Sequence, residues 1–285
     1  MTYGQLWRSL ATIYPAGEAK AIARYVFEVR FGLSATDVYC GKDTQLTAEE
    51  SRELEEIAVR LMASEPVQYV LGRADFCGRT FAVAPGVLIP RPETEDLCDM
   101  ILGRTAAGST VLDIGTGSGC IAVTLALGIA GSDVSAWDIS DAALAVARRN
   151  AAELGAHVSF ALRDALAPPA DAELWDVIVS NPPYICDSER AAMEQNVTAY
   201  EPHTALFVPD SDPLLFYRTI AGYAASALRP GGKLYFEINP RYSGETAAML
   251  RALGYGRVEV AEDRFGRERI VSAESGGEPH GGLRL

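Results

Sequence analysis

Apolar residues in the first part of the chain recur at the spacing of an α-helix. In the segment 18–31, Ile22, Val26 and Val29 fall on one helical face, and Gly32 follows shortly after them. Glycine readily takes the left-handed conformation that ends many helices, so we expect this helix to stop there. An apolar face of this kind has to be buried against a second element.

A second amphipathic helix is predicted after Thr47. Thr47 and Glu50 have the spacing of a capping box, in which the hydroxyl accepts a free backbone N–H and the carboxylate reaches back. The apolar residues behind them repeat every three or four positions: Leu54, Ile57, Ala58, Leu61 and Met62. We therefore predict a small helical domain over residues 1–64.

The character of the sequence changes at residue 65. Three short segments follow, separated by Gly and Pro: VQYVLG, TFAVAP and GVLIP. Such segments are typical of strands joined by turns, and we predict a β-hairpin linker over residues 65–92. Arg91 and Glu93 either line the mouth of a cleft or form a surface ion pair, and the sequence leaves both roles open.

Strand-like and helix-like segments alternate over residues 93–273. The predicted strands are the segments 110–114, 134–137, 158–161, 176–180, 233–238, 258–262 and 269–273. The predicted helices are the segments 93–102, 120–127, 141–154, 214–228 and 243–253. This alternation indicates an α/β fold with a doubly wound parallel sheet. Residues 274–285 are polar and glycine-rich, and we expect them to be disordered.

Composition and charge narrow the range of functions. The chain has 285 residues and a formal net charge of −13. Proteins that bind the nucleic-acid backbone normally carry a basic surface, so we expect no stable nucleic-acid binding, whereas a basic protein partner would suit this charge. The longest apolar stretch, residues 120–130, is shorter than the ~20 residues that cross a bilayer, so no membrane association is expected.

The cysteines and the N-terminal residues bear on the compartment. The five cysteines include no C-x-x-C pair, and there are only three histidines, so we expect no metal site. Scattered free thiols suit a reducing cytosol, and the first twenty residues contain no apolar segment of the secretory type. We therefore expect a cytoplasmic protein.

A glycine-rich loop follows the predicted strand 110–114. It consists of Gly115, Thr116, Gly117, Ser118 and Gly119. Glycines let the backbone approach a ligand closely, and the loop falls at the carboxyl edge of the sheet, where such folds bind ligands. The spacing departs from the dinucleotide pattern G-x-G-x-x-G and is similar to that of the glycine loop of S-adenosylmethionine-dependent methyltransferases.

Two carboxylates follow the next two predicted strands. Asp138 lies about 20 residues after the glycine loop, where an acidic residue can accept both ribose hydroxyls of an adenosyl group. Ser140 already provides a helix cap, which leaves Asp138 available for that role. Asp164 is placed to meet an adenine amino group, although a solvated loop carboxylate is nearly as good an interpretation.

The apolar segment 176–180 leads into Asn181, Pro182, Pro183 and Tyr184. The prolines stiffen the turn and remove two N–H donors. A planar NH₂ group would donate one hydrogen to the side-chain oxygen of Asn181 and the other to the carbonyl of Pro182, with the ring of Tyr184 on its face. This would hold a weakly nucleophilic nitrogen in line with a methyl sulfonium.

We therefore take Asn181, Pro182 and Tyr184 as the candidate catalytic residues. Pro183 joins them in the candidate substrate site, and Asn181 is also expected to border the cofactor. No base is required, because the nitrogen becomes acidic once it is methylated.

Several longer motifs add to these. They are Pro66–Gly72, the segment Val87–Glu95 (VLIPRPETE), the glycine loop, Asn181–Ile185, Glu201-Pro202 with Ala205-Leu206, and Tyr217-Arg218 before Pro230-Gly231-Gly232. On these motifs the sequence resembles, over residues 65–273, the protein-(glutamine-N5) methyltransferases that modify bacterial peptide-chain release factors.

The resemblance implies a seven-stranded, Rossmann-like methyltransferase domain that uses S-adenosylmethionine. It implies that residues 1–64 dock the substrate and that the methyl acceptor is the glutamine of a Gly-Gly-Gln segment in a release factor, a protein of translation termination. It also implies that Asn181 and Pro182 orient the acceptor amide, that Tyr184 helps to hold it, and that Gly115–Gly119 and Asp138 bind the cofactor. Nothing in the sequence demands a dimer, and we expect a monomer.

The chain departs from this family pattern at three places. Ala165 stands where relatives often have an aromatic residue against the adenine. The segment 207–210 (FVPD) replaces a glycine-rich stretch, and Asn239 replaces a glycine after Glu237-Ile238. These departures lie near the rim of the expected site and leave the motif at Asn181 intact.

Three other functions compete with this interpretation. A related enzyme methylates a glutamine of a ribosomal protein and shares the motif. An adenine-N6 methyltransferase would also fit, since an arylamine satisfies the same geometry, but residues 1–75 carry eight basic and eleven acidic side chains, unlike a nucleic-acid recognition domain. A non-enzymatic binding protein would have no chemical reason to keep the acceptor pair at Asn181 and Pro182.

Overall fold

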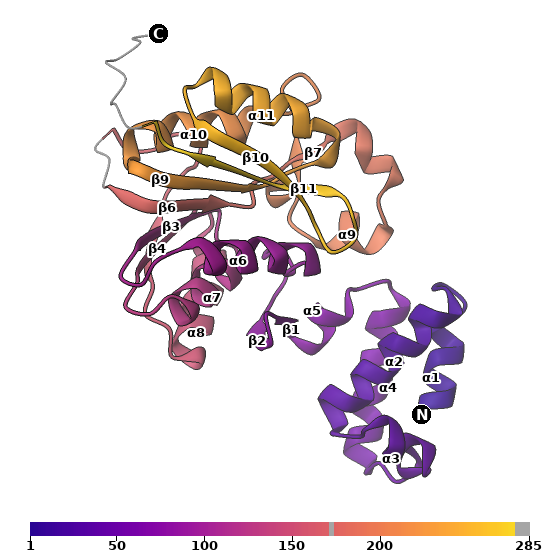
Figure 1. Cartoon of the computed structure of the whole chain (residues 1–285). Coiled ribbons are helices and arrows are strands. Elements are labelled where there is room, and N and C mark those ends of the chain that lie inside the picture. Colours follow the sequence, from indigo (N-terminus) through magenta and orange to yellow (C-terminus); the bar gives the residue numbers. More distant parts are fainter. Residues whose placement is uncertain (171–173, 277–285) are drawn as a thin grey trace. The chain divides into compact units, whose positions relative to one another are not determined.

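The structure, a computed structural model, describes residues 1–170 and 174–276 and divides the chain into two compact units (Figure 1). We call them the helical unit and the sheet unit. The helical unit comprises Met1–Arg73 and Met193–Tyr200, and the sheet unit comprises Ala74–Ala192 and Glu201–Leu285. The helical unit is therefore assembled from two stretches of chain that are far apart in sequence.

Short α-helices surround an apolar core in the helical unit. Its elements are α1 (Tyr3–Leu10), α2 (Ala16–Phe31), α3 (Ala35–Tyr39), the 3₁₀ segment η1 (Lys42–Thr44), α4 (Ala48–Met62), α5 (Val67–Leu71) and α9 (Gln195–Tyr200). Leu6, Phe27, Leu54 and Leu61 are fully buried in this core. The hydroxyl of Tyr200 donates to the backbone oxygen of Ala63 at 2.7 Å, which ties the distant stretch to the end of α4.

The predicted helix boundaries in this unit are confirmed at two places. Gly32 ends α2 with a φ of 64°, in the left-handed region. At the start of α4 the N–H of Glu50 donates to the Thr47 hydroxyl at 3.2 Å, and the N–H of Thr47 donates to the Glu50 carboxylate at 2.8 Å.

Replacing Thr47 with alanine should lower the free energy of unfolding by about 1 kcal/mol, because the N–H of Glu50 loses its partner. Urea unfolding followed by circular dichroism measures this. Thr12→Ala is the control, since Thr12 is exposed and bonds only to a carbonyl one turn back. Equal midpoints for the two variants would contradict the capping role.

One predicted strand is wrong. Residues 67–71 form the helix α5, which Gly72 ends with a φ of 71°. The apolar residues Val67, Val70 and Leu71 are three and four positions apart, and this spacing lets all three pack on the core of the helical unit. A short apolar run of this length fits a strand or a helix equally well until its partners are known.

The rest of the linker contains the expected hairpin. Strands β1 (Arg73–Phe76) and β2 (Arg79–Ala82) pair with each other across Cys77 and Gly78. The third predicted strand, GVLIP, joins no sheet in the structure, although Val87 and Ile89 are buried.

A seven-stranded sheet forms the centre of the sheet unit, as the resemblance implied. Its order is β10-β11-β9-β6-β3-β4-β5. These strands are β3 (Thr110–Ile114), β4 (Asp133–Asp138), β5 (Ser159–Leu162), β6 (Trp175–Ser180), β9 (Leu228–Glu237), β10 (Gly256–Glu262) and β11 (Glu268–Glu274). The five strands from β9 to β5 are parallel, whereas β10 and β11 run antiparallel to their neighbours. The sheet is therefore mixed rather than wholly parallel.

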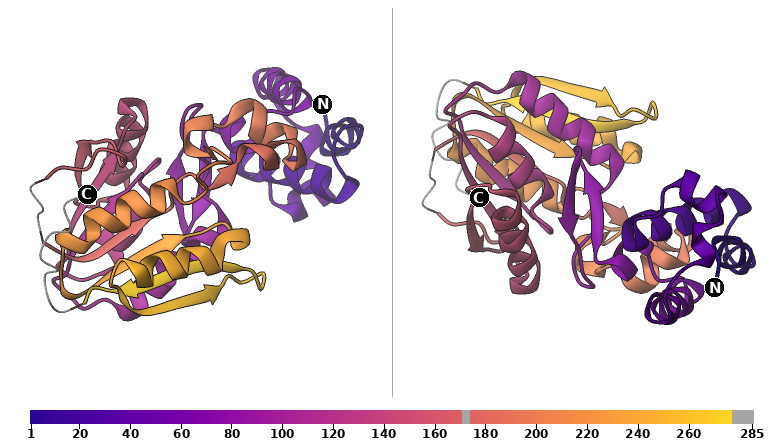
Figure 2. Two further views of the ribbon diagram at one scale, coloured as in Figure 1. Left: turned by 90° about the horizontal axis from the view of Figure 1, so that it is seen from above. Right: turned by 90° about the horizontal axis from the view of Figure 1, so that it is seen from below.

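Helices cover both faces of this sheet (Figure 2). One face packs on α10 (Leu215–Ala227) and α11 (Ser243–Ala252), and the other packs on α6 (Pro92–Arg104), α7 (Cys120–Gly128) and α8 (Asp141–Leu154). Alternate residues of β3 serve the two layers, with Leu112 facing the first and Val111 the second. The central strands are apolar on both sides for this reason.

Shorter elements complete the sheet unit. They are β7 (Ile185–Cys186), β8 (Phe207–Val208), η2 (Asp187–Ala192), η3 (His203–Ala205) and η4 (Pro240–Tyr242). Glu274 still belongs to β11, so the predicted disordered tail at 274–285 starts too early, and residues 277–285 lie outside the described residues. Among the described helices, none has the length and apolar character to cross a membrane.

Strand order places the functional candidates together. In the ladders, Ile114 at the end of β3 stands opposite Trp137 of β4 and Ser180 of β6. The ends of β3, β4 and β6 therefore lie at one carboxyl edge of the sheet. The chain also reverses direction here, going from β3 to β4 on one side and returning to β6 on the other, and open α/β sheets bind their ligands at such points.

Candidate active site

The glycine loop joins β3 to α7. The N–H groups of Gly115 and Thr116 both donate to the Trp137 oxygen at 2.9 Å, which fixes the loop against β4. Gly119 has a φ of 80°, and a Cβ there would lie 3.0 Å from the Cβ of Ala147. Both the backbone conformation and the lack of space therefore favour glycine at this position. A Cβ at Gly117 would meet no atom within 4 Å, so the backbone there borders open space.

Asp138 ends β4 beside this loop. One of its oxygens accepts the N–H of Gly117 at 2.8 Å, and the other accepts the N–H of Ser140 at 2.9 Å. A carboxylate has about four acceptor positions, so each oxygen can take a further donor. The side chain is thus held in place with capacity left for two hydroxyl groups. The hydroxyl of Ser140 caps α8, as expected.

Two buried polar residues form hydrogen bonds to the glycine loop. Asp113 accepts the hydroxyl of Thr116 at 2.6 Å, and burial raises the pKa of Asp113 to about 7. The side-chain amide of Asn150 donates to the backbone oxygens of Ser118 at 2.8 Å and Ala82 at 3.0 Å, and its oxygen accepts the N–H of Ala82 at 2.7 Å. Asn150 thereby joins the loop to β2, a role that sequence reasoning missed.

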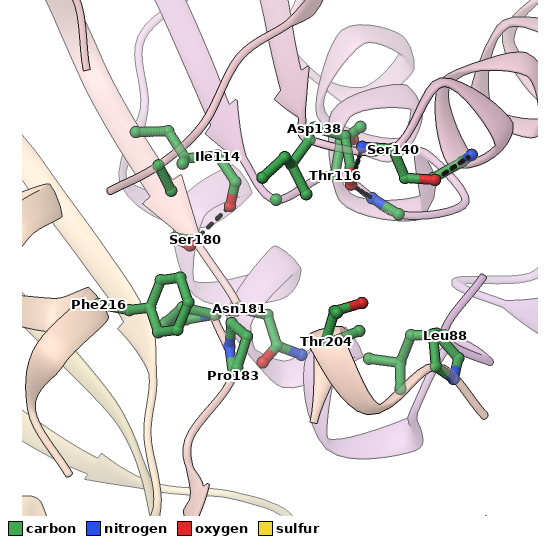
Figure 3. Close-up of a pocket in the computed structure, with 18 of the residues that line it drawn as sticks. Leu88, Ile114, Thr116, Asp138, Ser140, Ser180, Asn181, Pro183, Thr204 and Phe216 are labelled. Atoms are coloured by element: carbon green, nitrogen blue, oxygen red, sulfur yellow. Dashed lines mark hydrogen bonds between the residues drawn. The ribbon is translucent and has the colours of Figure 1, made fainter. Parts of the chain in front are cut away.

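A cavity of about 470 Å³ opens over the carboxyl edge of the sheet (Figure 3). Of the predicted site residues, those that line it are Gly115, Thr116, Gly117, Ser118, Asp138, Asp164, Asn181, Pro182 and Pro183. Gly119 and Tyr184 are not among the lining residues. Figure 3 shows Asp138 and Thr116 on one side of the cavity and Asn181, Pro183 and Thr204 on the other.

The far end of the cavity next to Asp164 has an aliphatic wall. Asp164 accepts the N–H of Leu166 at 2.8 Å, and Ala165, Leu166 and Ile139 line the cavity. The wall expected to replace the missing aromatic residue therefore has candidates in the side chains of Ile139 and Leu166.

Arg91 lines the cavity, which is the first of the two roles that the sequence left open, and its ion pair is not the surface pair of the second. It forms this ion pair with the buried Glu201, with 2.5 Å between Nη2 and Oε1. The second oxygen of Glu201 accepts the N–H of Ile89 at 3.1 Å. Glu201 thus fastens the segment before α6 to the segment before η3. Glu93 does not line the cavity.

Asn181 follows directly after β6 and faces the cavity. The preceding Ser180 is fully buried and donates its hydroxyl to the Ile114 oxygen at 2.6 Å, which locks the ends of β6 and β3 together. The side-chain nitrogen of Asn181 donates to the hydroxyl oxygen of Thr94, in α6, at 3.3 Å. Thr94 therefore holds the nitrogen end of the Asn181 amide.

Tyr184 points elsewhere than expected. Its hydroxyl donates to Glu237 at 3.0 Å, and the guanidinium of Arg269 lies 6.0 Å from its ring centre. Burial raises its pKa well above the usual value. The aromatic rings that line the cavity belong instead to Phe207 and Phe216.

Glu237 is the centre of a buried polar cluster at the end of β9. It is fully buried, it accepts the Thr94 hydroxyl at 2.6 Å as well as that of Tyr184, and burial raises its pKa to about 7. Asn239 follows it and donates to the backbone oxygen of Tyr184 at 3.1 Å. The departure from glycine at 239 therefore adds a bond that holds the turn after Asn181.

Sequence reasoning included Thr94 in the motif Val87–Glu95 but gave it no role, and it missed the contacts of Glu237. A signal was present, since Glu237 is a lone carboxylate at the end of the apolar strand residues 234–236, next in the sheet to the strand that carries Asn181. Its partner on α6 could not be read from the sequence, because 143 positions separate the two residues.

Comparison with known proteins shows the fold and the family of the chain. The family model for the PrmC N-terminal domain matches residues 8–72, and that for the methyltransferase small domain matches residues 96–200. A methyltransferase from Pyrococcus furiosus has a similar fold, with a TM-score of 0.52 at 17% identity, over 81% of this chain and 100% of that one.

Two relatives match almost the whole chain. A release factor glutamine methyltransferase of Bacteroides thetaiotaomicron is 50% identical over 267 residues, which are 93% of this chain and 96% of the relative. One from Flavobacterium psychrophilum is 37% identical over 272 residues, 94% and 95% of the two chains. The resemblance found in the motifs is thus confirmed, and the chain belongs to the family of release factor glutamine methyltransferases.

Proposed function

We propose that this protein transfers a methyl group from S-adenosylmethionine to the side-chain amide nitrogen of the glutamine in the Gly-Gly-Gln segment of a peptide-chain release factor. The observation that carries the proposal is the position of Asn181, which lines one cavity together with the glycine loop and Asp138. The relatives named as release factor glutamine methyltransferases support the choice of acceptor.

The residues around the cavity fit S-adenosylmethionine. Its volume of about 470 Å³ lies in the range of roughly 300–1,000 Å³ usual for small-molecule sites. Asp138 would accept the ribose hydroxyls, Gly115 and Gly117 would let the backbone lie against the ligand, and Asp164 would meet the adenine amino group. Bound there, the cofactor supplies a methyl group on a positively charged sulfur.

Asn181 and Pro182 would prepare the acceptor. An amide nitrogen is a poor nucleophile because its electron pair is delocalised into the carbonyl. If the side-chain oxygen of Asn181 and the backbone oxygen of Pro182 each accept one amide hydrogen, electron density shifts towards the nitrogen and the nitrogen is held in line with the methyl group. Once this nitrogen had received the methyl group that the cofactor would supply, it would be acidic and would release one hydrogen to water as a proton.

Such a reaction requires no strong base in the site. The described residues that line the cavity include no histidine and no lysine. The work of these side chains would be positioning rather than proton transfer, which suits a nitrogen that becomes acidic on methylation.

The remaining expectations belong to the same proposal. Residues 1–64 would dock the release factor, residues 65–92 would link the two domains, and residues 93–273 would carry out methyl transfer. We propose a cytoplasmic monomer with no stable affinity for nucleic acid. The formal net charge of −13 supports an interaction with a basic protein.

Incubation with a release factor and S-adenosylmethionine should add one methyl group, which mass spectrometry of peptides would locate on the glutamine of Gly-Gly-Gln. The unmethylated factor is the required substrate, and a factor with this glutamine replaced by alanine is the control. No mass gain on a folded, unmethylated factor would refute the proposal. Ribosomal protein and DNA would then be tested as acceptors, in that order.

A further inference from the structure

The polar contacts of Asn181 form a directed chain that ends on a buried carboxylate. Its side-chain nitrogen meets the Thr94 oxygen at 3.3 Å, and the Thr94 oxygen meets Glu237 at 2.6 Å. Thr94 is 3% exposed and Glu237 is fully buried, so the bond between these two side chains is shielded from water. The three residues come from three elements: the end of β6, the first turn of α6, and the end of β9.

The chemistry of the three groups gives this chain a direction. A hydroxyl has a single hydrogen, and an ionised carboxylate only accepts. Burial raises the pKa of Glu237 to about 7, so above this pH the carboxyl is mostly ionised. Thr94 then gives its hydrogen to Glu237, and its oxygen can only accept. The group that Asn181 turns towards Thr94 must be its NH₂, which leaves the side-chain oxygen on the opposite side of the amide.

The second oxygen of Glu237 is also fixed. It accepts the hydroxyl of Tyr184 at 3.0 Å, and the guanidinium of Arg269 approaches that hydroxyl at 3.5 Å. The hydroxyl of Tyr217 donates to the backbone oxygen of Glu237 at 3.3 Å. The carboxylate is thus held by the hydroxyls of Thr94 and Tyr184, one on each oxygen, and it cannot turn away from Thr94 without breaking both bonds.

An asparagine amide that is free to flip would be useless half of the time in the reaction proposed above. In one orientation it offers an acceptor to the substrate NH₂, and in the other it offers a donor, so that two donors would face each other. Packing alone does not fix the orientation, because the oxygen and the NH₂ group of the amide have nearly the same shape. Only a hydrogen-bond partner distinguishes them.

We propose that Thr94, held by the buried Glu237, is a positioning residue that fixes the orientation of the Asn181 amide so that its oxygen faces the methyl acceptor. The expected change in kcat rests on the proposed function, whereas the orientation of the Asn181 amide does not. Thr94 lines the cavity and Glu237 does not, and in this proposal Thr94 acts on the acceptor through the Asn181 amide.

The test compares Thr94→Val, which keeps the shape and removes the hydroxyl, with Thr94→Ser, which restores it. At pH 8, where Glu237 is ionised, Thr94→Val should lower kcat for release factor methylation about tenfold with KM for the cofactor unchanged, and Thr94→Ser should recover most of this loss. Thr246→Val is the matched control, because Thr246 is also fully buried in a helix and donates to a carbonyl at 2.8 Å. It should lose stability but keep its kcat.

A second measurement reads the geometry directly. In protein labelled with ¹⁵N at asparagine, the side-chain amide signal of Asn181, identified by its absence in Asn181→Asp, should exchange slowly with solvent in the wild type and in Thr94→Ser. It should exchange faster in Thr94→Val. Equal exchange in all three proteins, or a kcat for Thr94→Val within about threefold of the wild type, would overturn the inference. Absence of methylation by the wild type, with the exchange pattern as expected, would refute the proposed function and leave the positioning role standing.

Discussion

Replacing Asn181 with alanine should lower kcat for methyl transfer by about 100- to 1,000-fold and leave cofactor affinity within about twofold. Loss of one preorganised group aimed at the reacting centre has an effect of this order in other enzymes. The side chain lines the cavity, and among the described residues it makes no hydrogen bond to the glycine loop or to Asp138, which hold the cofactor in our proposal. The effect should therefore fall on the chemical step.

Steady-state transfer of radiolabelled methyl groups to a release factor gives kcat, and calorimetric titration with S-adenosylhomocysteine gives the affinity. Thermal unfolding checks that the variant is folded. A kcat within tenfold of the wild type would mean that Asn181 does not orient the acceptor. A parallel loss of cofactor affinity would place the residue in the cofactor site instead.

Asp138→Ala is expected to have the second largest effect, a rise of at least about 100-fold in the dissociation constant for the cofactor. Hydrogen bonds to a charged group contribute about 1.5–3 kcal/mol each, and two hydroxyl groups would lose their acceptor. The variant also removes the bond that holds the N–H of Gly117 at 2.8 Å, so the glycine loop loses part of its support.

Asp141→Ala is the matched control for charge. Asp141 is exposed, lies in the first turn of α8 and carries the same negative charge three positions further on. Calorimetry with S-adenosylhomocysteine should give a near-normal dissociation constant for this control. If the two variants bound equally well, the ribose role of Asp138 would be wrong.

The parts of the fold that depend on local pattern were predictable. Strand–helix alternation predicts parallel strands, parallel strands bring their carboxyl ends to one edge, and this alone places the glycine loop, Asp138 and Asn181 together. The helix α5 was not predictable, because Val67–Leu71 is too short for its period to be decisive. The antiparallel placement of β10 and β11 was likewise missed, since apolar spacing carries no direction.

The supporting residues of the site were out of reach for a different reason. Thr94, Asn150 and Glu237 are ordinary polar residues in their own segments, and their importance comes from partners 32 to 143 positions away. The residues proposed to touch the ligands lie in unusual local sequence, such as the two prolines after Asn181. Residues that only hold them in place do not, and only the packed structure reveals them.

The division of the helical unit between two stretches of chain affects the order in which this protein can fold. Synthesis runs from the N-terminus, and domains commonly fold as they emerge. Helices α1 to α5 are complete at Leu71, yet the contact between Tyr200 and Ala63 that closes their unit needs residues made about 130 positions later. By then β3 to β6 have already been synthesised. The last step in building the N-terminal unit must therefore follow the synthesis of half of the central sheet, which couples the maturation of the two units during translation.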